Sequence, residues 1–530
     1  MAQLQAFSAF DRSPLGHYEI TSPEQILQSL QDSRLAARQW QQLSIKQRLK
    51  KLAKLNQLLI EQADSICQLL THCSGKVATE ALLAELIPVL DLHRYYQQHA
   101  PAILKNRPIA CSPFTHPFAT AEISRQGHGV VAIITPWNYP LQLTLSPLLT
   151  ALVAGNSVIF KVSELSLPIA DLILALCQQL ELPKDLVQAV IGDGETGQQL
   201  IAAGPDLVFF TGSLETGRAV MQTAAQHPIP VILELGGKDA MLILADANLE
   251  RASHAALYGA FSNSGQVCMS LERIYVDRRC HDVFLQALVD RLATLQPASG
   301  LDGDYGPLCT EAQYIRLQRQ YEDAIAQGAM ASGPLIRTGN FIQPVVLWNV
   351  TPQMRIMQEE SFGPIVAVMA FDDTQQAVDL INDCQYGLNG SIFSQNIGLA
   401  NALARQLELG NWAINDVIKN AGHAGLPFGG VKHSGFGRYR GAEGLRQFSR
   451  TVSGLSNHSS LAQEPNWFPY HSERYALFKA HIDFVYGPGH FLLRMCRHWR
   501  TLISFRDYAR PDLQQIWHNL IQSLPWKQDY

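Results

Sequence analysis

The chain has 530 residues, of which 47% are hydrophobic and 16% charged, so it can bury a large core and is not a mostly disordered protein. Its 41 Lys and Arg against 46 Asp and Glu give a formal net charge of -5, which gives no support for a nucleic-acid-binding surface. Nine cysteines, an odd number without a Cys-x-x-Cys pair, predict reduced thiols in the cytoplasm and no metal site.

The N-terminal part of the chain is predicted to be helical and to contain no export signal. Its first residues lack the charged start and the continuous apolar run of a secretory signal. Residues 22–98 repeat apolar positions such as Leu52, Leu55 and Leu59 at spacings of three and four, which predicts helices packed on a larger body. The most apolar stretch, residues 141–160, is interrupted by polar residues and predicts no membrane span.

Short apolar segments then alternate with helical ones in two regions of the chain. The predicted strands are residues 130–134, 157–161, 186–191, 207–210, 231–233 and 241–244 in the first region, and 273–276, 344–347, 365–370, 391–393 and 412–414 in the second. This alternation predicts two α/β domains, each a largely parallel sheet with helices on both faces.

The composition changes after Ser453, and residues 454–530 contain four of the eight tryptophans. Residues 491–506 are predicted to form an amphipathic helix. Its apolar face would hold Leu492, Met495, Cys496, Trp499, Leu502 and Ile503, and its other face Arg494, Arg497, Arg500 and Thr501. Such a helix either packs its apolar face on protein, which is the commoner case, or lies on an anionic membrane surface.

Three segments carry residue types suited to covalent catalysis. Cys268 ends a Ser-Gly-Gln-Val-Cys turn, where a thiol has room to attack a substrate. Glu234 follows an apolar strand and precedes two glycines, so it is a candidate general base close to a ligand. Asn138 follows another strand, where its amide is a candidate oxyanion donor. Taken singly, each residue type is more often a buried thiol, a solvated carboxylate or a turn residue.

Together these segments resemble the NAD(P)-dependent aldehyde dehydrogenase superfamily over residues 25–455. The motifs stand in the family's order: ITPWNYP at 134–140, FTGS at 210–213, ELGGK at 234–238, SGQVC at 264–268, EESFGP at 359–364 and PFGGVKHSGFGR at 427–438. The resemblance implies an α/β fold with a Rossmann-like NAD-binding domain, a second α/β catalytic domain and a small β-rich oligomerisation arm. The expected boundaries are 1–106 and 128–235 for the NAD-binding domain, 236–430 for the catalytic domain, 107–127 and 431–455 for the arm, and 456–530 for a C-terminal aromatic and basic extension.

The resemblance also implies a mechanism. Cys268 would attack the aldehyde carbon, the Asn138 amide and the Cys268 backbone N–H would hold the thiohemiacetal oxyanion, and hydride would pass to NAD. Glu234 would then activate the water that hydrolyses the thioester to a carboxylic acid. Family members that transfer the acyl group to coenzyme A usually lack this glutamate, so a CoA-dependent acylating enzyme is the less favoured alternative. A catalytically silent member is a third possibility, against which the intact Cys268, Glu234 and Asn138 argue.

By the same resemblance, five segments would bind the dinucleotide. Lys161 and Glu164 would reach the adenosine ribose, and the Glu164 carboxylate favours NAD over NADP because it would repel a 2′-phosphate. A helix beginning after Ser213 would approach the pyrophosphate, and Glu360 and Phe362 would position the nicotinamide ribose and ring. The full expected set is Thr135, Trp137, Lys161, Glu164, Thr211, Gly212, Ser213, Gly217, Leu235, Glu360 and Phe362.

The substrate pocket implied by the resemblance contains no charged side chain. It consists of Tyr139, Leu143, Val267, Met269 and Phe428. An acidic substrate normally needs an arginine anchor, so we expect an apolar aldehyde, aliphatic or aromatic. The resemblance further implies a homodimer or homotetramer, and the amphipathic C-terminal helix adds the hypothesis of peripheral membrane contact.

Overall fold

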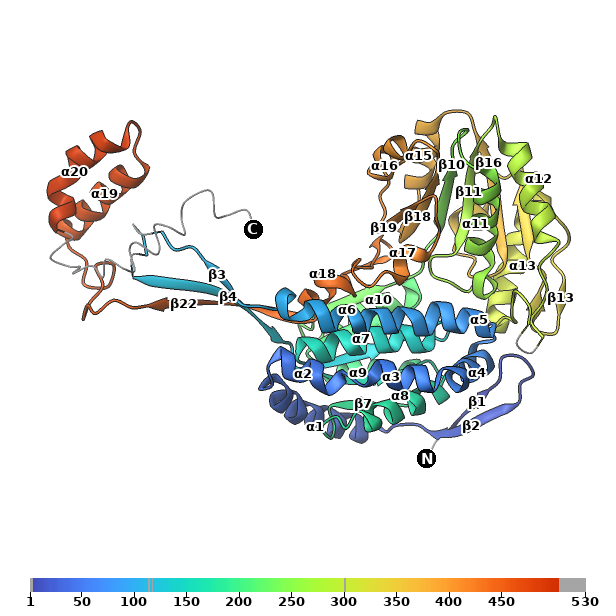
Figure 1. Ribbon diagram of the computed structural model, residues 1–530, viewed down its shortest axis with the longest axis horizontal. Helices are drawn as coiled ribbons and strands as arrows, with labels where there is room; N and C mark the ends of the chain where they lie inside the picture. Colours follow the sequence, from blue (N-terminus) through green and yellow to red (C-terminus); the bar gives the residue numbers. More distant parts are fainter. Residues whose placement is uncertain (1–2, 113–114, 117, 300–301, 505–530) are drawn as a thin grey trace. The chain divides into compact units, whose positions relative to one another are not determined.

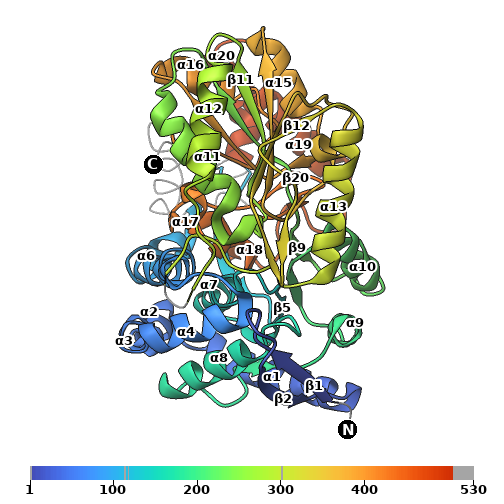
Figure 2. The same cartoon turned by 90° about the vertical axis from the view of Figure 1, so that its right-hand side faces the viewer.

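The computed structural model describes residues 3–112, 115–116, 118–299 and 302–504. The chain forms two compact units: unit 1 contains residues 1–104 and 126–450, and unit 2 contains residues 105–125 and 451–530. Unit 1 holds two large sheets, each covered by helices (Figures 1 and 2). Every strand predicted for the two alternating regions is confirmed, which establishes the α/β fold class.

The first sheet of unit 1 has the strand order β21-β9-β8-β5-β6-β7. Its strands are β5 (Val130–Ile134), β6 (Ser157–Lys161), β7 (Val187–Ala189), β8 (Leu207–Thr211), β9 (Val231–Glu234) and β21 (Gly435–Phe436). All neighbours pair in parallel except β21, which is antiparallel to β9. The chain winds outward from β5 to β7 and then returns to place β8 on the other side of β5. In α/β sheets, ligands bind at such a reversal, beyond the carboxyl ends of the strands.

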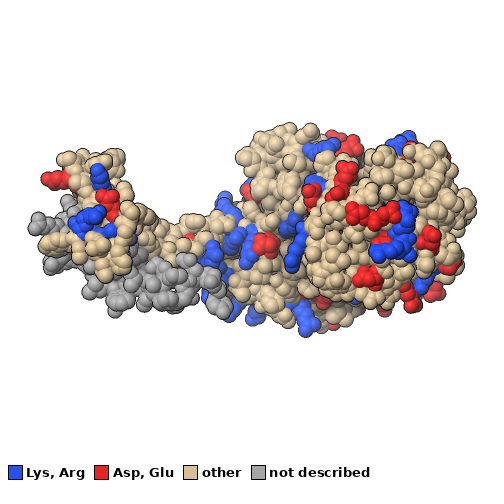
Figure 3. Space-filling view, turned by 90° about the horizontal axis from the view of Figure 1, so that it is seen from above, with Lys and Arg blue, Asp and Glu red and all other residues tan. Residues whose placement is uncertain are grey.

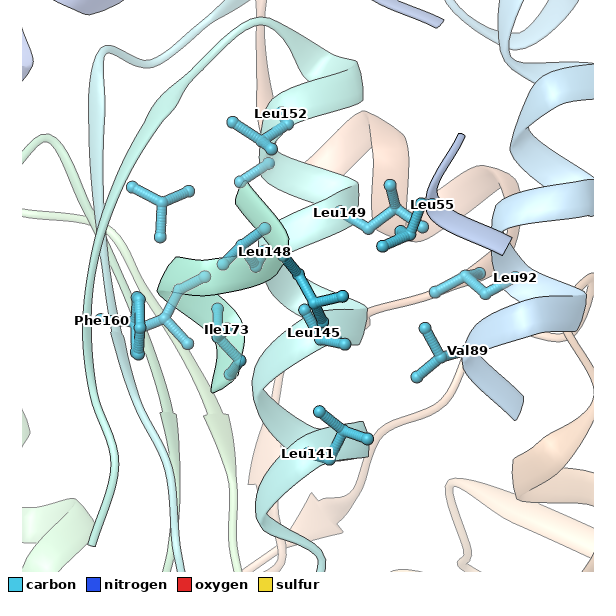
Figure 4. Packing of buried hydrophobic residues seen from close by; sticks show 14 of the residues in the cluster. Leu55, Val89, Leu92, Leu141, Leu145, Leu148, Leu149, Leu152, Phe160 and Ile173 are labelled. Carbon is cyan, nitrogen blue, oxygen red and sulfur yellow. The ribbon is translucent and has the colours of Figure 1, made fainter. Parts of the chain in front are cut away.

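One helix beside this sheet is buried along its whole length. All 15 residues of α7 (Pro140–Ala154) are buried, between the sheet, α8 (Pro168–Gln179) and α6 (Ile87–Ile103). Leucines of α7 point toward apolar side chains of these neighbours (Figure 4): Leu141, Leu145, Leu148, Leu149 and Leu152 meet Val89, Leu92, Phe160 and Ile173. Full burial of one leucine contributes roughly 1.5–3 kcal/mol. The packing of α7 therefore fixes the segment between β5 and α7, which contains Asn138.

The second sheet of unit 1 has the order β12-β15-β16-β11-β10-β18-β19 and is parallel except at β12. Its strands are β10 (Asp239–Ile243), β11 (Leu271–Asp277), β12 (Met330–Ala331), β15 (Val345–Trp348), β16 (Ile365–Phe371), β18 (Asn389–Phe393) and β19 (Asn411–Ile414). Helices α11 (Leu249–Phe261) and α12 (His281–Leu292) cover one face, and α13 (Glu311–Ala326) and α15 (Thr374–Asn382) cover the other (Figure 2). The predicted second α/β region is confirmed.

The N-terminal region is helical as predicted, with two additions. A hairpin of β1 (Gln3–Phe7) and β2 (Pro14–Glu19) precedes α1 (Pro23–Gln41) and has no counterpart in the sequence-based prediction. Between α5 (Ala78–Glu80) and α6, a π-helical turn, η1 (Ala81–Leu86), replaces regular α-helix. Such turns are rare and are often found at functional sites.

Unit 2 contains a three-stranded sheet and two helices. The sheet has the order β22-β4-β3, with β3 (Arg107–Ile109), β4 (Ala119–Gly127) and β22 (Ser449–Asn457). The helices are α19 (Ser472–Tyr486) and α20 (Phe491–Ser504), and α20 confirms the helix predicted for this part of the chain. Only the end of the predicted arm segment 431–455 joins this sheet, because residues up to Arg450 belong to unit 1. The division into cofactor, catalytic and arm domains stays a prediction.

Three further findings concern the residues that the structure describes. In the described ranges, no helix combines the length and the hydropathy that crossing a bilayer requires. All nine cysteines lie in these ranges, and each is a free thiol. Within the same ranges, no cluster of His, Cys, Asp and Glu is arranged to hold a metal ion.

Candidate active site

A cavity of about 220 Å³ lies beyond the carboxyl ends of β5, β8 and β9. Its walls bring together the three predicted catalytic residues, Asn138, Glu234 and Cys268. Seven predicted cofactor residues and one predicted substrate residue also line it: Trp137, Thr211, Gly212, Ser213, Leu235, Glu360, Phe362 and Leu143. The reversal of winding between β5 and β8 explains why the residues at the ends of these strands meet here.

Cys268 follows a strained turn. Asn263, Ser264 and Gly265 all have left-handed backbone conformations, with φ of 48°, 56° and 70°. A β-carbon at Gly265 would lie 2.2 Å from the carbonyl oxygen of Gly363, so this position accepts only glycine. The Asn263 N–H donates to the Glu80 carboxylate at 2.6 Å, and the Ser264 hydroxyl donates to the Gly306 carbonyl at 2.6 Å. Strain held in place by surrounding contacts is common at functional sites.

The environment of Cys268 keeps its thiol protonated. Burial and the nearby carboxylates of Asp239, Glu234 and Glu360 raise the pKa of the thiol far above its usual value, while the Met269 backbone N–H acts weakly in the opposite direction. The side chain itself remains partly exposed at the cavity wall. A substrate carbonyl can therefore reach the sulfur, but a base must first remove its proton.

Asn138 is held from both its side chain and its backbone. Its amide nitrogen donates to the Gln266 carbonyl at 3.0 Å, which leaves the second amide hydrogen for a ligand. Its own carbonyl accepts from the Lys76 ammonium at 2.6 Å and from the Asn263 amide at 3.2 Å. The amide is therefore fixed in orientation before any substrate binds.

A buried ion pair supports this arrangement and was not predicted. Lys76 and Glu85 are fully buried and bonded to each other, and Lys76 lies 4.3 Å from the centre of the Tyr139 ring. Glu85 also accepts from the backbone N–H groups of Leu141 and Gln142, each at 2.9 Å, at the start of α7. A carboxylate at a helix N-terminus satisfies donors that lack partners within the helix. Because charged residues are usually exposed, the burial of this pair could not be predicted from the sequence.

Glu234 ends β9, as predicted, and is almost completely buried. Neither of its carboxyl oxygens has a hydrogen-bond partner among the described residues. Burial raises the pKa of this carboxyl well above its usual value, and the positive charges of Arg438 and Arg440 only partly oppose the rise. An unpartnered buried carboxyl on a cavity wall is suited to bind a water molecule and to exchange a proton with it.

The walls beyond Cys268 fit a dinucleotide. Ser213 caps α10 (Leu214–Ala224) by accepting from the Thr216 N–H, so the N-terminus of this helix faces the cavity. A β-carbon at Gly212 would lie 2.5 Å from the Phe210 ring, and one at Gly217 would lie 2.6 Å from Leu235. Both positions therefore favour glycine, which lets the loop after β8 pack on Phe210 and α10 pack on Leu235.

Arginine side chains line a recess next to this cavity. A second recess of about 570 Å³ shares Ser213, Ala312, Arg316 and Glu360 with the first cavity. Its remaining walls add three more arginines: Arg218, Arg319 and Arg355. Guanidinium groups at this position are suited to phosphate oxygens. Three residues that line these cavities were not identified from the sequence: Gln313, Arg316 and Arg218. Residues that share one face of a helix form no contiguous sequence motif.

Glu360 and Phe362 are held by a second buried ion pair. Lys238 donates to the Glu272 carboxylate at 2.6 Å, and Glu272 accepts from the backbone N–H groups of Ser361 and Phe362. Glu360 accepts from the Gly237 N–H at 3.1 Å, and burial raises the pKa of its carboxyl to about 7. The Phe362 ring meets Trp137 edge-on, with ring centres 5.7 Å apart.

The other predicted cofactor residues do not line the cavity. Lys161 ends β6 and is buried, and burial lowers the pKa of its ammonium. Glu164 lies three residues later and is exposed. The Thr135 hydroxyl is bonded to that of Thr144 at 2.7 Å. These positions follow the carboxyl ends of β5 and β6, next to the reversal of winding.

The predicted substrate residues divide into two groups. Leu143 lines the cavity. Tyr139 is half-buried, with the Lys76 ammonium 4.3 Å from the centre of its ring. Val267, Met269 and Phe428 are almost completely buried in the hydrophobic cluster that contains α7. Their role as substrate contacts stays a prediction.

Comparison with known proteins places these observations in context. Residues 2–453 match the model of the aldehyde dehydrogenase family. A 4,4'-diapolycopene aldehyde oxidase from Methylomonas sp is 55% identical over 529 residues, which cover 100% of both chains. A betaine aldehyde dehydrogenase from Bacillus subtilis is 32% identical over 81% of this chain and 88% of its own. The crystal structure of a betaine aldehyde dehydrogenase from Staphylococcus aureus in complex with NAD+ is 31% identical, with a TM-score of 0.82 over 88% of this chain and 94% of that chain.

Proposed function

The chain belongs to the aldehyde dehydrogenase family, and from this premise we propose that it oxidises a long apolar aldehyde to the carboxylic acid with NAD as the oxidant. The observation that carries the proposal is the single cavity lined by Asn138, Glu234 and Cys268. The relative that matches the whole chain is named for a polyene aldehyde. Leu143 on the cavity wall and the lack of charge at the expected substrate positions support the same class of substrate.

In the proposed first half-reaction, the Cys268 thiol gives its proton to solvent water and the sulfur bonds to the aldehyde carbon. The free amide hydrogen of Asn138 and the Cys268 backbone N–H stabilise the resulting oxyanion, and one such donor is typically worth about 3 kcal/mol. NAD, when bound, supplies the hydride acceptor that converts the thiohemiacetal to a thioester. The residues proposed to hold it are those of the cleft described above, with Glu164 setting the preference for NAD over NADP.

In the proposed second half-reaction, Glu234 takes a proton from water while the oxygen of that water attacks the thioester carbon. The carboxylic acid leaves, and Cys268 recovers its thiol. Since burial raises the pKa of the Glu234 carboxyl, a larger share of it stays neutral than of an exposed glutamate, and the fraction that can act as a base grows as the pH rises. Hydrolysis is therefore proposed to become faster with pH.

We also propose an assembly and a location. The sheet of unit 2 has two outer strands, β3 and β22, whose residues are largely exposed, and unpaired edges of this kind are able to join further strands. This supports a homodimer or homotetramer built through the predicted arm. The free thiols support the cytoplasm as the compartment. Residues 456–530 are proposed to bring the enzyme into peripheral contact with a membrane.

One assay tests the oxidation. The purified chain is mixed with NAD and, in turn, with an alkanal, an aromatic aldehyde, a carboxylated semialdehyde and a polyene dialdehyde in detergent, each with and without coenzyme A. NADH and the acid product are both measured. Equal amounts of NADH and acid without coenzyme A, highest for the apolar aldehydes, are the expected result. A strict requirement for coenzyme A would instead indicate the acylating reaction, and no turnover of any aldehyde would indicate a catalytically silent member.

A further inference from the structure

The two helices of unit 2 form a small folded element with its own interior. We call residues 467–499 the aromatic hairpin; it contains α19 and most of α20 (Figure 1). Leu477 and Phe484 are buried inside it. Arg494 on α20 donates to the carbonyls of Val485 and Gly487, which ties the second helix to the end of the first. The hairpin therefore has a packed core and a fixed turn.

The large apolar side chains on its outside are unusually exposed. Nine of them have between 52% and 76% of their surface accessible: Trp467, Phe468, Tyr470, Tyr475, Ile482, Tyr486, Leu492, Leu493 and Trp499. In the space-filling view, uncharged side chains make up most of the visible face of the hairpin, with a few charged ones among them (Figure 3). Apolar surface concentrated in this way usually marks an interaction site.

The chemistry of these side chains suits a lipid interface. Five of the nine are Trp or Tyr, whose rings have an apolar body and a polar edge and which gather at the headgroup level of bilayers. Among the side chains of the two helices that the structure describes, the exposed charges are Glu473 and Asp483 against Lys479 and Arg497, which cancel. Arg494, which the sequence assigned to a basic face, is used within the hairpin. Aromatic insertion rather than attraction to anionic lipid is thus the stronger force available.

The comparison with relatives also points to a lipid bilayer as the binding partner of this segment. The family model ends at residue 453, before the hairpin begins. The relative named for a polyene aldehyde nevertheless matches over the entire chain. A polyene aldehyde partitions into the hydrocarbon of a bilayer, so an enzyme acting on it gains from a position at the membrane surface.

We infer that the aromatic hairpin docks the enzyme on the interfacial layer of a lipid bilayer, including one made only of zwitterionic lipid. The inference rests on the proposed function for the choice of a bilayer over a protein partner. It assigns the membrane contact to described side chains of α19 and its flanking segments rather than to a basic helix face.

The test is flotation of the full chain with phosphatidylcholine vesicles at low and high salt. The variant carries Phe468→Ser, Tyr475→Ser, Tyr486→Ser and Leu493→Ser. The matched control carries Leu35→Ser, Ile60→Ser, Val283→Ser and Met330→Ser, which change apolar residues of unit 1 that have between 55% and 64% of their surface exposed. The native chain and the control are expected to float at both salt concentrations, and the hairpin variant is expected to show a roughly 100-fold lower partition coefficient.

Two results would overturn the inference. Binding only to vesicles that contain phosphatidylglycerol, with release by salt, would indicate an electrostatic contact instead. A native chain that does not float, and whose oligomers dissociate in the hairpin variant, would assign the surface to a second copy of the chain. Light scattering of both proteins distinguishes this case.

Activity separates a failure of docking from a failure of the proposed function. Hexanal in solution should be oxidised equally by the native chain and the hairpin variant, which also shows that the variant is folded. A polyene aldehyde embedded in phosphatidylcholine vesicles should be oxidised at least about tenfold more slowly by the variant. If no aldehyde is oxidised by the native chain, the proposed function fails, while flotation still reports on the surface.

Discussion

The active-site region of unit 1 and the aromatic hairpin of unit 2 depart from ordinary protein surfaces in opposite ways. Around Cys268, charged groups such as Lys76, Glu85 and Glu234 are buried in apolar surroundings. On the hairpin, aromatic groups such as Phe468 and Tyr475 are exposed to water. Each departure costs free energy in the isolated chain. The comparison teaches that buried ionisable groups mark the proposed reaction site of this enzyme. Exposed aromatic groups mark the surface through which it is proposed to bind a membrane.

The largest effect is expected at the sulfur itself. Cys268→Ala should lower turnover of every aldehyde by more than about 1,000-fold, because no covalent intermediate can form. The melting temperature should stay close to that of the native chain, since the side chain is small and partly exposed. NADH formation and thermal unfolding are measured together. Turnover within tenfold of the native rate would show that Cys268 is not the nucleophile.

The next effect tests whether the buried charges of unit 1 support its structure. Glu85→Ala leaves the Lys76 ammonium buried without its counter-ion, which should cost about 3–5 kcal/mol of stability. Asp372→Ala removes the exposed partner of Arg278 and should lower the stability much less, because both side chains are in contact with water. Denaturant unfolding gives both values. Similar losses for the two variants would mean that the Lys76–Glu85 pair has no special structural role.

A smaller loss of turnover is expected at Glu234, which is proposed to act only in hydrolysis of the thioester. Glu234→Gln should give a burst of NADH followed by steady turnover about 100-fold slower than that of the native chain, because the thioester forms but water is not activated. In the native chain, the raised pKa of Glu234 means that steady turnover should increase as the pH rises through that pKa, at a higher pH than for an exposed glutamate. The variant should lose this increase. A variant without a burst would place Glu234 before the hydride step.

The smallest effect on catalysis is expected from a change in unit 2. Deletion of residues 456–530 removes the hairpin and should change the rate of hexanal oxidation by less than about twofold, because none of the residues lining the cavity lies in that segment. The melting temperature of the remaining chain should also be retained. A large loss of hexanal activity would show that the extension supports catalysis and not only docking.

The strands were predictable because parallel sheets bury both faces and so produce continuous apolar runs such as residues 130–134. The hairpin of β1 and β2 was not, because only Ala6 among its strand residues is buried, so the strands contain no continuous apolar run. For the site, motifs identified the residues at strand ends, including Glu234. They could not identify Lys76 or Arg316, whose role depends on neighbours distant in sequence.

The expected state of Cys268 also shows the limit of reasoning from a motif. A glycine-flanked turn suggests an accessible thiolate, whereas three nearby carboxyl groups and burial hold the proton on the sulfur. Those carboxyls come from three different segments of the chain: Glu234, Asp239 and Glu360. Their combined field is a property of the folded arrangement, and it cannot be read from the spacing of residues around the cysteine.

The close approach of Gly265 to the Gly363 carbonyl has a consequence for attempts to redesign the enzyme. The turn that precedes Cys268 contacts the loop of Glu360 and Phe362 through backbone atoms. No side chain lies between the two segments to absorb a displacement. A shift in either loop is therefore transmitted directly to the other. Engineers who remodel residues 359–364 will also displace the turn that precedes Cys268, and the two segments will have to be redesigned jointly.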